Sequence, residues 1–340
     1  DRPARRRVSR REAGLFFLRT TGTAMETMET IQILSHPDAR QSGVPRKFTR
    51  WAGKETVARV GRFHRAMEGY DPTPLLALDG MANRLGLASL WIKDESRRFG
   101  LEAFKVLGAA WAMMRLLADR LGLESRNLGP ADLIRPEIGR RLAGWTCITA
   151  TDGNHGRAVA WAARRLGCRA VVYLPADVTP ARVAHIRSLG ARTEIVAGSY
   201  DLAVQRAAQT AARKDWILVQ DTSGPGYEQV PRWIMQGYLT LFDEAYEQLS
   251  GQRPTHVFLQ CGVGSFAASG LAYLLERFGG RRPRFVVVEP EGAGCYFASV
   301  QAGDGRPHPL DGPLDTLMGG LSCGRPSPLA WRVLGRGADA

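Results

Sequence analysis

The sequence has no apolar run long enough to cross a lipid bilayer, and it contains only five cysteines among 340 residues. A membrane-spanning helix needs about 20 consecutive apolar residues, so no such helix is predicted. The cysteines lack the regular spacing of a disulfide framework or a zinc site. We therefore expect a protein of the reducing cytoplasm, with neither a metal centre nor a membrane partner.

Acidic residues are also under-represented, with 33 Asp and Glu against 46 Lys and Arg and a net charge of +13. Residues 1–24 alone carry seven Arg against two acids, and this stretch is predicted to be a disordered tail, an over-extended start before Met25, or a transit peptide. The remaining basic residues form no stripe interleaved with aromatic residues. The charge therefore does not indicate a nucleic-acid partner.

From about residue 71, β-branched segments alternate with segments of helical periodicity, as in an α/β protein. Buried strands joined by helices favour open, twisted, mostly parallel sheets flanked by helices. Strands are predicted at 89–93, 146–149, 170–174, 192–196, 217–220, 256–260 and 284–289. Helices are predicted at 81–87, 106–121, 156–166, 179–189, 201–214, 227–249 and 265–278, and a surface connection at 122–142. Ligands of such folds bind beyond the carboxyl ends of the strands.

Three loops that follow strands carry candidate chemistry. The first, residues 96–105, ends in Lys105 beside Phe104. Apolar neighbours disfavour an ammonium and lower its pKa, which an imine-forming lysine requires. The alternative is a lysine that extends over apolar surface from a helix start.

The second loop, residues 149–156, contains small residues and two glycines before a helix. Its backbone N–H groups suit a carboxylate. Asn154 could bond a ring hydroxyl, whereas Asp152 could simply cap the helix and His155 could be a packed residue.

The third loop, Gln260-Cys261-Gly262-Val263-Gly264-Ser265, has the character of a phosphate cradle at a helix N-terminus. Gly262, Gly264 and the later Glu289 also match a dinucleotide fingerprint. That match leaves open a nicotinamide-dependent oxidoreductase, although such an enzyme would give the first two loops no function.

Taken together, the loops resemble those of fold-type II pyridoxal-phosphate (PLP) enzymes, and the sequence resembles diaminopropionate ammonia-lyases over residues 48–331. The resemblance rests on segments 98–105, 149–157, 219–222, 226–228, 233–238, 288–291 and 319–324. Its most specific parts are Asp152-Gly153-Asn154-His155-Gly156 and Trp233-Ile234-Met235-Gln236-Gly237-Tyr238. Serine and threonine dehydratases usually have a hydroxyl residue at the position of Asp152.

The resemblance implies PLP on Lys105 and α,β-elimination of D- and L-2,3-diaminopropionate to pyruvate and two ammonia molecules. Lys105 would take the α proton of the L substrate and Asp152 that of the D substrate, because a carboxylate on the opposite face can act as a base. Asp201 matches a second acid of the family, with a helix cap as the alternative. The cofactor would be held by Phe104, Asn154, Gly262, Val263, Gly264 and Ser265. The substrate would be held by Thr151, Asp152, Gly153, Asn154 and His155.

The resemblance also implies a homodimer and a two-domain chain. The large domain would comprise residues 48–108 and 220–340, the smaller one residues 109–219, and residues 1–47 would form a tail and lead-in. Cys295 and Cys323 flank the expected site and are a possible thiol pair, with two free thiols as the alternative. The family continues beyond the point matching Trp331, so a non-catalytic PLP-binding remnant and a serine or threonine dehydratase remain as alternatives.

Overall fold

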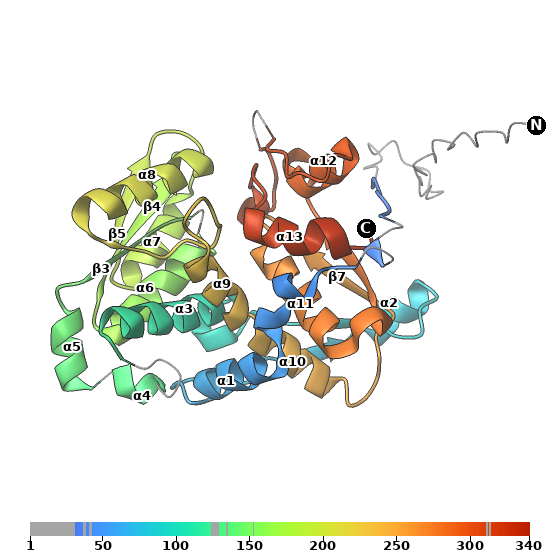
Figure 1. Cartoon of the computed structure of the whole chain (residues 1–340), viewed down its shortest axis with the longest axis horizontal. Helices are drawn as coiled ribbons and strands as arrows, with labels where there is room; N and C mark the ends of the chain where they lie inside the picture. The colour runs from blue at the N-terminus through green and yellow to red at the C-terminus, as the bar shows by residue number, and fades with distance from the viewer. Residues whose placement is uncertain are drawn as a thin grey trace, which may run out of the picture.

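The computed structural model describes residues 31–36, 39–40, 43–123, 129–133, 135–151, 153–310, 312 and 314–340. The predicted tail, residues 1–24, lies outside the described residues. Two sheet-containing lobes lie side by side, with helix α9 between them and α3 beside α6 of the first lobe (Figure 1). The observed helices are α1 Lys54–Arg65, α2 Asp79–Arg84, α3 Lys105–Arg120, α4 Pro130–Leu133, α5 Pro136–Leu142, α6 Asn154–Leu166, α7 Pro180–Ser188, α8 Tyr200–Lys214, α9 Gln229–Gly237, α10 Leu239–Gln248, α11 Ser265–Phe278, α12 Cys295–Ala302 and α13 Pro328–Gly337.

The first lobe contains a four-stranded parallel sheet in the order β5-β4-β3-β6. Its strands are β3 Thr146–Ala150, β4 Arg169–Pro175, β5 Arg192–Val196 and β6 Ile217–Leu218. Successive side chains of β4 enter two different cores, Val171 on the side of α8 and Val172 on the side of α6. Because side chains of a strand alternate between faces, the helices cover both faces of the sheet.

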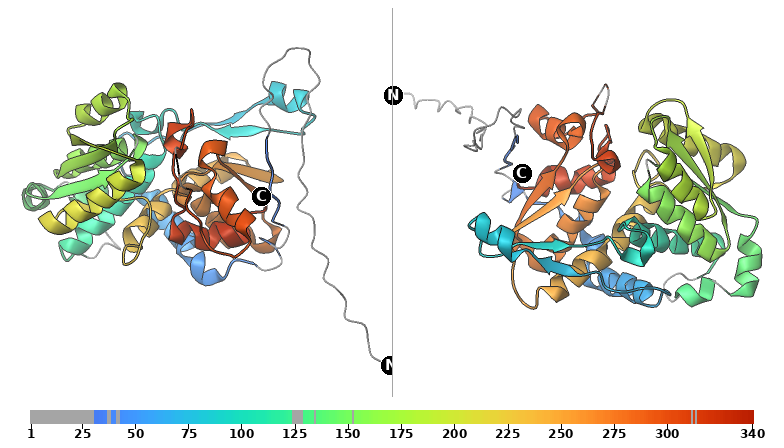
Figure 2. Two further views of the ribbon diagram at one scale, coloured as in Figure 1. Left: turned by 90° about the horizontal axis from the view of Figure 1, so that it is seen from above. Right: turned by 180° about the vertical axis from the view of Figure 1, so that it is seen from behind.

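The second lobe contains the parallel pair β7 His256–Gln260 and β8 Arg284–Val288. Helices α11 and α13 pack together in its core, which includes Leu271, Phe285 and Leu334. The predicted α/β class with mostly parallel sheets is confirmed. A third, antiparallel pair, β1 Leu75–Ala77 and β2 Trp91–Lys93, projects from the body with α2 (Figure 2).

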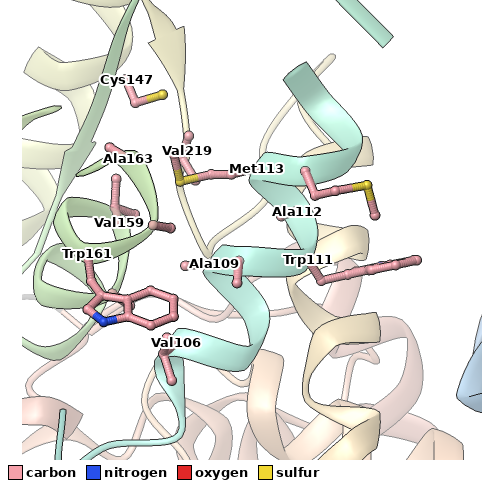
Figure 3. Close-up of a cluster of buried hydrophobic side chains, with 14 of the residues drawn as sticks. Val106, Ala109, Trp111, Ala112, Met113, Cys147, Val159, Trp161, Ala163 and Val219 are labelled. Carbon is pink, nitrogen blue, oxygen red and sulfur yellow. The ribbon is translucent and has the colours of Figure 1, made fainter. Parts of the chain in front are cut away.

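Helix α3 joins the lobes because it packs against α6 on one side and α9 on the other (Figure 3). Its contact with α9 depends on two glycines. A Cβ on Gly108 would lie 2.9 Å from the Ile234 carbonyl oxygen, and one on Gly237 would overlap the Leu107 carbonyl. The two helix backbones therefore approach more closely than any larger residue at these positions allows.

Two of the predicted segments are wrong in detail. The single helix predicted at 227–249 is two helices, α9 and α10, which meet at Tyr238. The chain turns there beside the close contact of Gly237 with α3, which the helical periodicity alone does not reveal. The predicted surface connection at 122–142 contains two short helices, α4 and α5, each beginning at a proline that is favourable at a helix start.

The predicted division into a large and a small domain stays a prediction. Helix α3, most of which was assigned to the small domain, shares one continuous core with α9 of the large domain. Within the described part of the chain, none of the helices has both the length and the apolar character needed to cross a membrane.

His64 is a fully buried polar link between α1, α3 and α10. Its Nε2 atom lies 3.0 Å from the Leu107 carbonyl oxygen, which can only accept, so Nε2 carries the hydrogen. Its Nδ1 atom lies 2.7 Å from the Thr240 hydroxyl and accepts that hydrogen. Burial lowers the pKa of His64 to about 3 from its ordinary value of 6.5, so the folded protein holds the neutral ring.

This burial predicts a loss of stability in acid. Because the folded pKa is lowered, the stabilising contribution is complete above pH 6.5 and is lost as the pH falls towards 3. At pH 5 the loss should be about 2 kcal/mol in the free energy of unfolding. Urea unfolding at pH 7 and pH 5 measures it. His64→Gln, which has no such proton uptake, should lose about 2 kcal/mol less over this interval than the wild type, and an equal loss in both proteins would contradict the assignment.

Candidate active site

Lys105 is the first residue of α3, the helix that packs against both α6 and α9. Its Nζ atom donates a hydrogen bond to Asp221 Oδ2 at 2.5 Å, and its side chain is 22% exposed. Burial alone would lower the pKa of Lys105, but the Asp221 carboxylate outweighs burial and raises it above the ordinary value. The prediction of a lowered pKa is therefore wrong for the free lysine, because apolar neighbours are only part of its surroundings.

Asp221 follows β6 at the carboxyl edge of the first sheet, and its role was missed in the sequence analysis. Burial would raise the pKa of Asp221, but the charge of Lys105, the nearby His155 and the hydrogen bond from Lys105 together lower it to about 2. Neighbouring contacts fix the backbone: Tyr227 Oη accepts from Gln220 N at 2.9 Å, and Ser265 Oγ donates to the Asp221 carbonyl at 2.6 Å. The sequence signal that could have revealed this role is an acidic residue just after a strand, because ligands of such folds bind beyond the carboxyl ends of the strands.

The glycine loop also contacts Asp221, through the hydrogen bond from Ser265 that is described above. Gly264 has a φ of +95°, and a Cβ there would overlap Tyr296 Oη, which itself donates to the Val263 carbonyl oxygen at 3.0 Å. Gly264, the residue that precedes α11, has no side chain with which to cap the helix. The first N–H groups of α11 could therefore bind an anion, as N–H groups at helix N-termini do.

The asparagine loop meets the same region from the first lobe. Thr151 is buried, and its Oγ1 accepts from Gly153 N at 2.9 Å. Asn154 is exposed at the start of α6, whereas His155 is buried and lies 3.9 Å from Asp221 between Nδ1 and Oδ2. Asp152 lies outside the described residues.

Aromatic side chains line the lysine on the side of the second lobe. The rings of Phe104 and Phe266 stack with centroids 4.1 Å apart, and Tyr238 meets Phe104 edge to face. The Tyr238 hydroxyl is buried and has no hydrogen-bond partner among the described residues. A buried donor of this kind is costly unless a ligand supplies the acceptor.

These features fit PLP. Lys105 provides an amine, the glycine loop provides N–H groups for a phosphate, and the unpartnered Tyr238 hydroxyl provides a polar contact. The site thus offers an attachment point, an anion cradle and an aromatic wall in one place.

Asp201 is not brought to Lys105 by any contact within the described residues. Its carboxylate is about one-third exposed and pairs with Arg325, with Oδ2 and Nε 3.5 Å apart. The alternative, a capping role, is wrong, since Ser199 caps α8 by accepting from Leu202 N. The catalytic role of Asp201 stays a prediction. Asp201 instead connects the first lobe to the segment before α13.

Glu289, the candidate ribose ligand of a nicotinamide enzyme, is engaged in the structure. Its carboxylate oxygens accept from Tyr296 N at 2.9 Å and Phe297 N at 2.7 Å, so it caps the start of α12. Burial raises its pKa to about 7. This engagement removes the acid that the nicotinamide interpretation needs.

Cys295 and Cys323 both lie beside Gly262, and neither forms a disulfide bond in this structure. Cys295 Sγ lies 3.9 Å from the Gly262 carbonyl oxygen, and a Cβ on Gly262 would lie 3.2 Å from Cys323 Sγ. Both thiols thus border the glycine loop as predicted, and their pairing stays a prediction.

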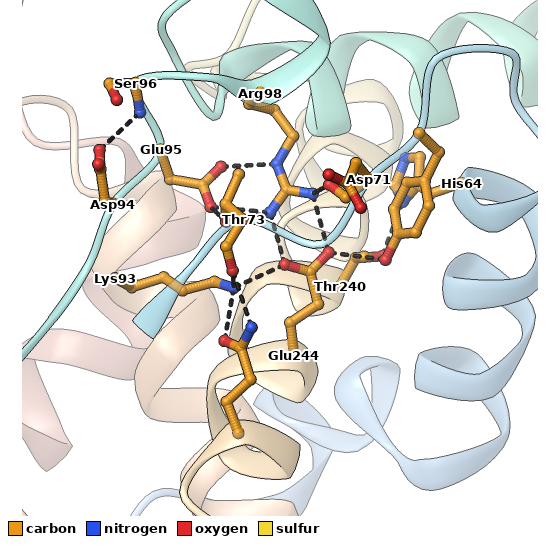
Figure 4. A network of polar contacts seen from close by, with 12 residues as sticks. His64, Asp71, Thr73, Lys93, Asp94, Glu95, Ser96, Arg98, Thr240 and Glu244 are labelled. Atoms are coloured by element: carbon orange, nitrogen blue, oxygen red, sulfur yellow. Dashed lines mark hydrogen bonds and ion pairs between the residues drawn. The ribbon is translucent and has the colours of Figure 1, made fainter. Parts of the chain in front are cut away.

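A buried ionic network holds the loop that leads to Lys105 (Figure 4). The Arg98 guanidinium is 1% exposed and binds both Glu244 oxygens, at 2.8 and 2.6 Å. Lys93 approaches the same carboxylate to 2.8 Å, and Glu95 accepts from Arg98 Nε at 2.8 Å. Phe99 has a φ of +49°, so this anchor also holds a conformation that is unusual for a bulky residue.

The profile of a family described as "PALP: Pyridoxal-phosphate dependent enzyme" matches residues 66–340. The chain is 47% identical over 285 residues to "Diaminopropionate ammonia-lyase" of Salmonella typhimurium strain LT2, covering 83% of this chain and 70% of that protein. It is 44% identical over 283 residues to the protein of the same name from Escherichia coli K12, covering 82% and 70%.

Solved structures agree with these sequence relationships. The Escherichia coli diaminopropionate ammonia-lyase in complex with D-serine superposes with a TM-score of 0.76 at 40% identity, over 85% of this chain and 72% of that chain. A complex of the same enzyme with an "aminoacrylate-PLP azomethine reaction intermediate" gives 0.77 at 41% identity, over 85% and 71%. The chain belongs to the PLP-dependent enzymes and, within them, to the diaminopropionate ammonia-lyase family.

The Arg98 network predicts an unequal response to loss of charge. Glu244→Gln leaves the buried Arg98 and Lys93 with one carboxylate instead of two, and should lower the free energy of unfolding by about 3 kcal/mol. Glu228→Gln is the matched control, because Glu228 also binds two cations, Arg232 and Arg332, but is 35% exposed. It should cost less than about 1 kcal/mol. Similar losses in both variants, measured by urea unfolding, would contradict a buried anchor.

Proposed function

We propose that this chain catalyses α,β-elimination of 2,3-diaminopropionate, in both enantiomers, to pyruvate and two ammonia molecules, with PLP attached to Lys105. The observation that carries the proposal is the placement of a lysine amine and a carboxylate 2.5 Å apart between a glycine loop and an asparagine loop. Relatives that are 44–47% identical bear the name of this activity. A small amino acid is therefore the substrate class.

The proposed roles follow from where the groups lie. PLP, when bound, supplies an electron sink for the charge that develops at the substrate Cα. Lys105 holds the cofactor and takes the α proton of the L substrate, and the N–H groups of residues 262–265 bind the phosphate. Asn154 contacts the ring oxygen, and residues 151–155 bind the substrate carboxylate.

For the D substrate, we propose that Asp152 is the base that takes the α proton, from the face of the substrate opposite to Lys105. A carboxylate there also complements the second ammonium of a diamino acid. We further propose a homodimer in the cytoplasm and retain the domain division at residues 109–219. Asp221 is assigned a different role from Asp152, because it pairs with the Lys105 amine and sets its charge.

An absorbance and product assay tests the proposal. The full chain incubated with PLP should absorb in the visible region and release pyruvate from both enantiomers of 2,3-diaminopropionate. Lys105→Ala should abolish the colour and the product, while Lys214→Ala, which removes a cation lying over the Trp216 ring, should change neither. Pyruvate from D-serine but from neither enantiomer of 2,3-diaminopropionate would instead support a dehydratase.

The two acids Asp221 and Asp201 should differ in their effect on turnover. Asp221→Asn removes the counter-ion of Lys105 and should lower kcat/KM by about 100-fold, the scale of a lost acid–base contribution. Asp201→Asn removes only a longer, partly exposed pair with Arg325, so its effect should stay within about 3-fold. A loss for Asp201→Asn as large as that for Asp221→Asn would support the predicted catalytic role of Asp201.

A further inference from the structure

The His155 ring has a buried acceptor atom, Nδ1, that has no role in the reaction proposed above. Its Nε2 atom lies 2.9 Å from the Val219 carbonyl oxygen, so Nε2 carries the hydrogen and Nδ1 of the neutral ring is an acceptor. Nδ1 is buried and has no hydrogen-bond partner within the part of the chain that the structure describes. The side chain is only 3% exposed, so water does not readily satisfy this atom.

The neighbour of this unsatisfied acceptor is itself an acceptor in the resting ion pair. Asp221 Oδ2 lies 3.9 Å from His155 Nδ1, and as a carboxylate it has no hydrogen to donate. Burial lowers the pKa of His155 despite the nearby carboxylate, so the ring does not supply the hydrogen either. The two atoms face each other without a proton between them.

The Lys105 amine, in contrast, carries one proton more than its reaction with the cofactor allows. Attachment to an aldehyde needs the free electron pair of a neutral amine, but the pair with Asp221 favours the ammonium. Among the described residues, Asp221 Oδ2 lies 2.5 Å from this amine and can take the excess proton. A protonated Asp221 would then be a buried donor, and such a donor needs an acceptor.

We propose that His155 is the positioning residue that accepts a hydrogen bond from protonated Asp221 when Lys105 becomes a neutral amine. One Nζ–H bond of Lys105 breaks, its electron pair stays on Nζ, and the proton bonds to Asp221 Oδ2. The new hydroxyl turns towards Nδ1 and closes the 3.9 Å gap. The net charge of the three groups remains zero throughout. The inference rests on the proposed function only in assigning cofactor attachment to Lys105.

The other titratable groups near Asp221 leave this arrangement intact. Tyr227 and Tyr238 are phenols whose pKa values are raised by burial, so both stay neutral at physiological pH. Lys105 and Asp221 are therefore the charged groups that act on the His155 ring within the described structure.

Two substitutions of His155 separate this role from simple packing. In Gln the amide nitrogen can occupy the place of Nε2, so the bond to Val219 is kept but the Nδ1 acceptor is lost. In Asn the amide oxygen can occupy the place of Nδ1, so the acceptor is kept and the Val219 bond is lost. A structural role predicts rescue by Gln, whereas an acceptor role predicts rescue by Asn.

The first readout is the rate at which the cofactor-free full chain combines with PLP, followed by absorbance between pH 6 and 10. His155→Gln should load about 10-fold more slowly than the wild type at pH 7.5, with its pH midpoint raised by about one unit. His155→Asn should stay within about 3-fold. The proposal is overturned if His155→Gln loads PLP at the wild-type rate, or if His155→Gln restores the loading rate and His155→Asn does not.

A second readout does not need the cofactor or a fast reaction. In Lys105→Met, Asp221 lacks its cation and should take up a proton at neutral pH, giving an infrared carbonyl band that is lost in Lys105→Met/Asp221→Asn. Adding His155→Gln should shift that band, since its acceptor is gone. An absent or unshifted band would overturn the proposal. If the wild type loads PLP normally but releases no pyruvate, the proposed function fails while this inference stands.

Discussion

The ion pair between Lys105 and Asp221 joins parts of the chain that are 116 residues apart and connects both lobes. Burying two charges is expensive, and removing either partner alone would leave an uncompensated charge in the interior. The amine is supplied by the start of α3, and the carboxylate by the end of the first sheet. The glycine loop is tied to the same point, because Ser265 bonds the Asp221 backbone. The geometry of all three loops therefore depends on this contact.

The scaffold positions the pair by close backbone packing and by a second buried charge network. Gly108 and Gly237 allow α3 to lie directly against α9, which fixes the axis from which Lys105 extends. Arg98 and Glu244 fix the loop before it. A larger residue at either glycine would displace the lysine relative to Asp221, and a short hydrogen bond does not tolerate such a displacement.

Local patterns were sufficient to predict the α/β class and most of the strands, because buried β-branched runs and helix-ending glycines such as Gly167 are local signals. They also located Lys105 and the glycine loop. The break at Tyr238, the pairing of Arg98 with Glu244 and the role of Asp221 were not found from the sequence. Each depends on partners far apart in the chain, 146 residues for Arg98 and Glu244, and no local periodicity encodes such a contact.

The central claim is that one particular lysine, held by Asp221, carries the cofactor. Borohydride reduction of the PLP-loaded chain, followed by peptide mass spectrometry, tests it most directly, because reduction makes the linkage permanent. The account predicts a single phosphopyridoxyl group on the peptide that contains Lys105. A label on Lys93, Lys214 or another lysine, or no label on a protein that has bound PLP, would contradict it.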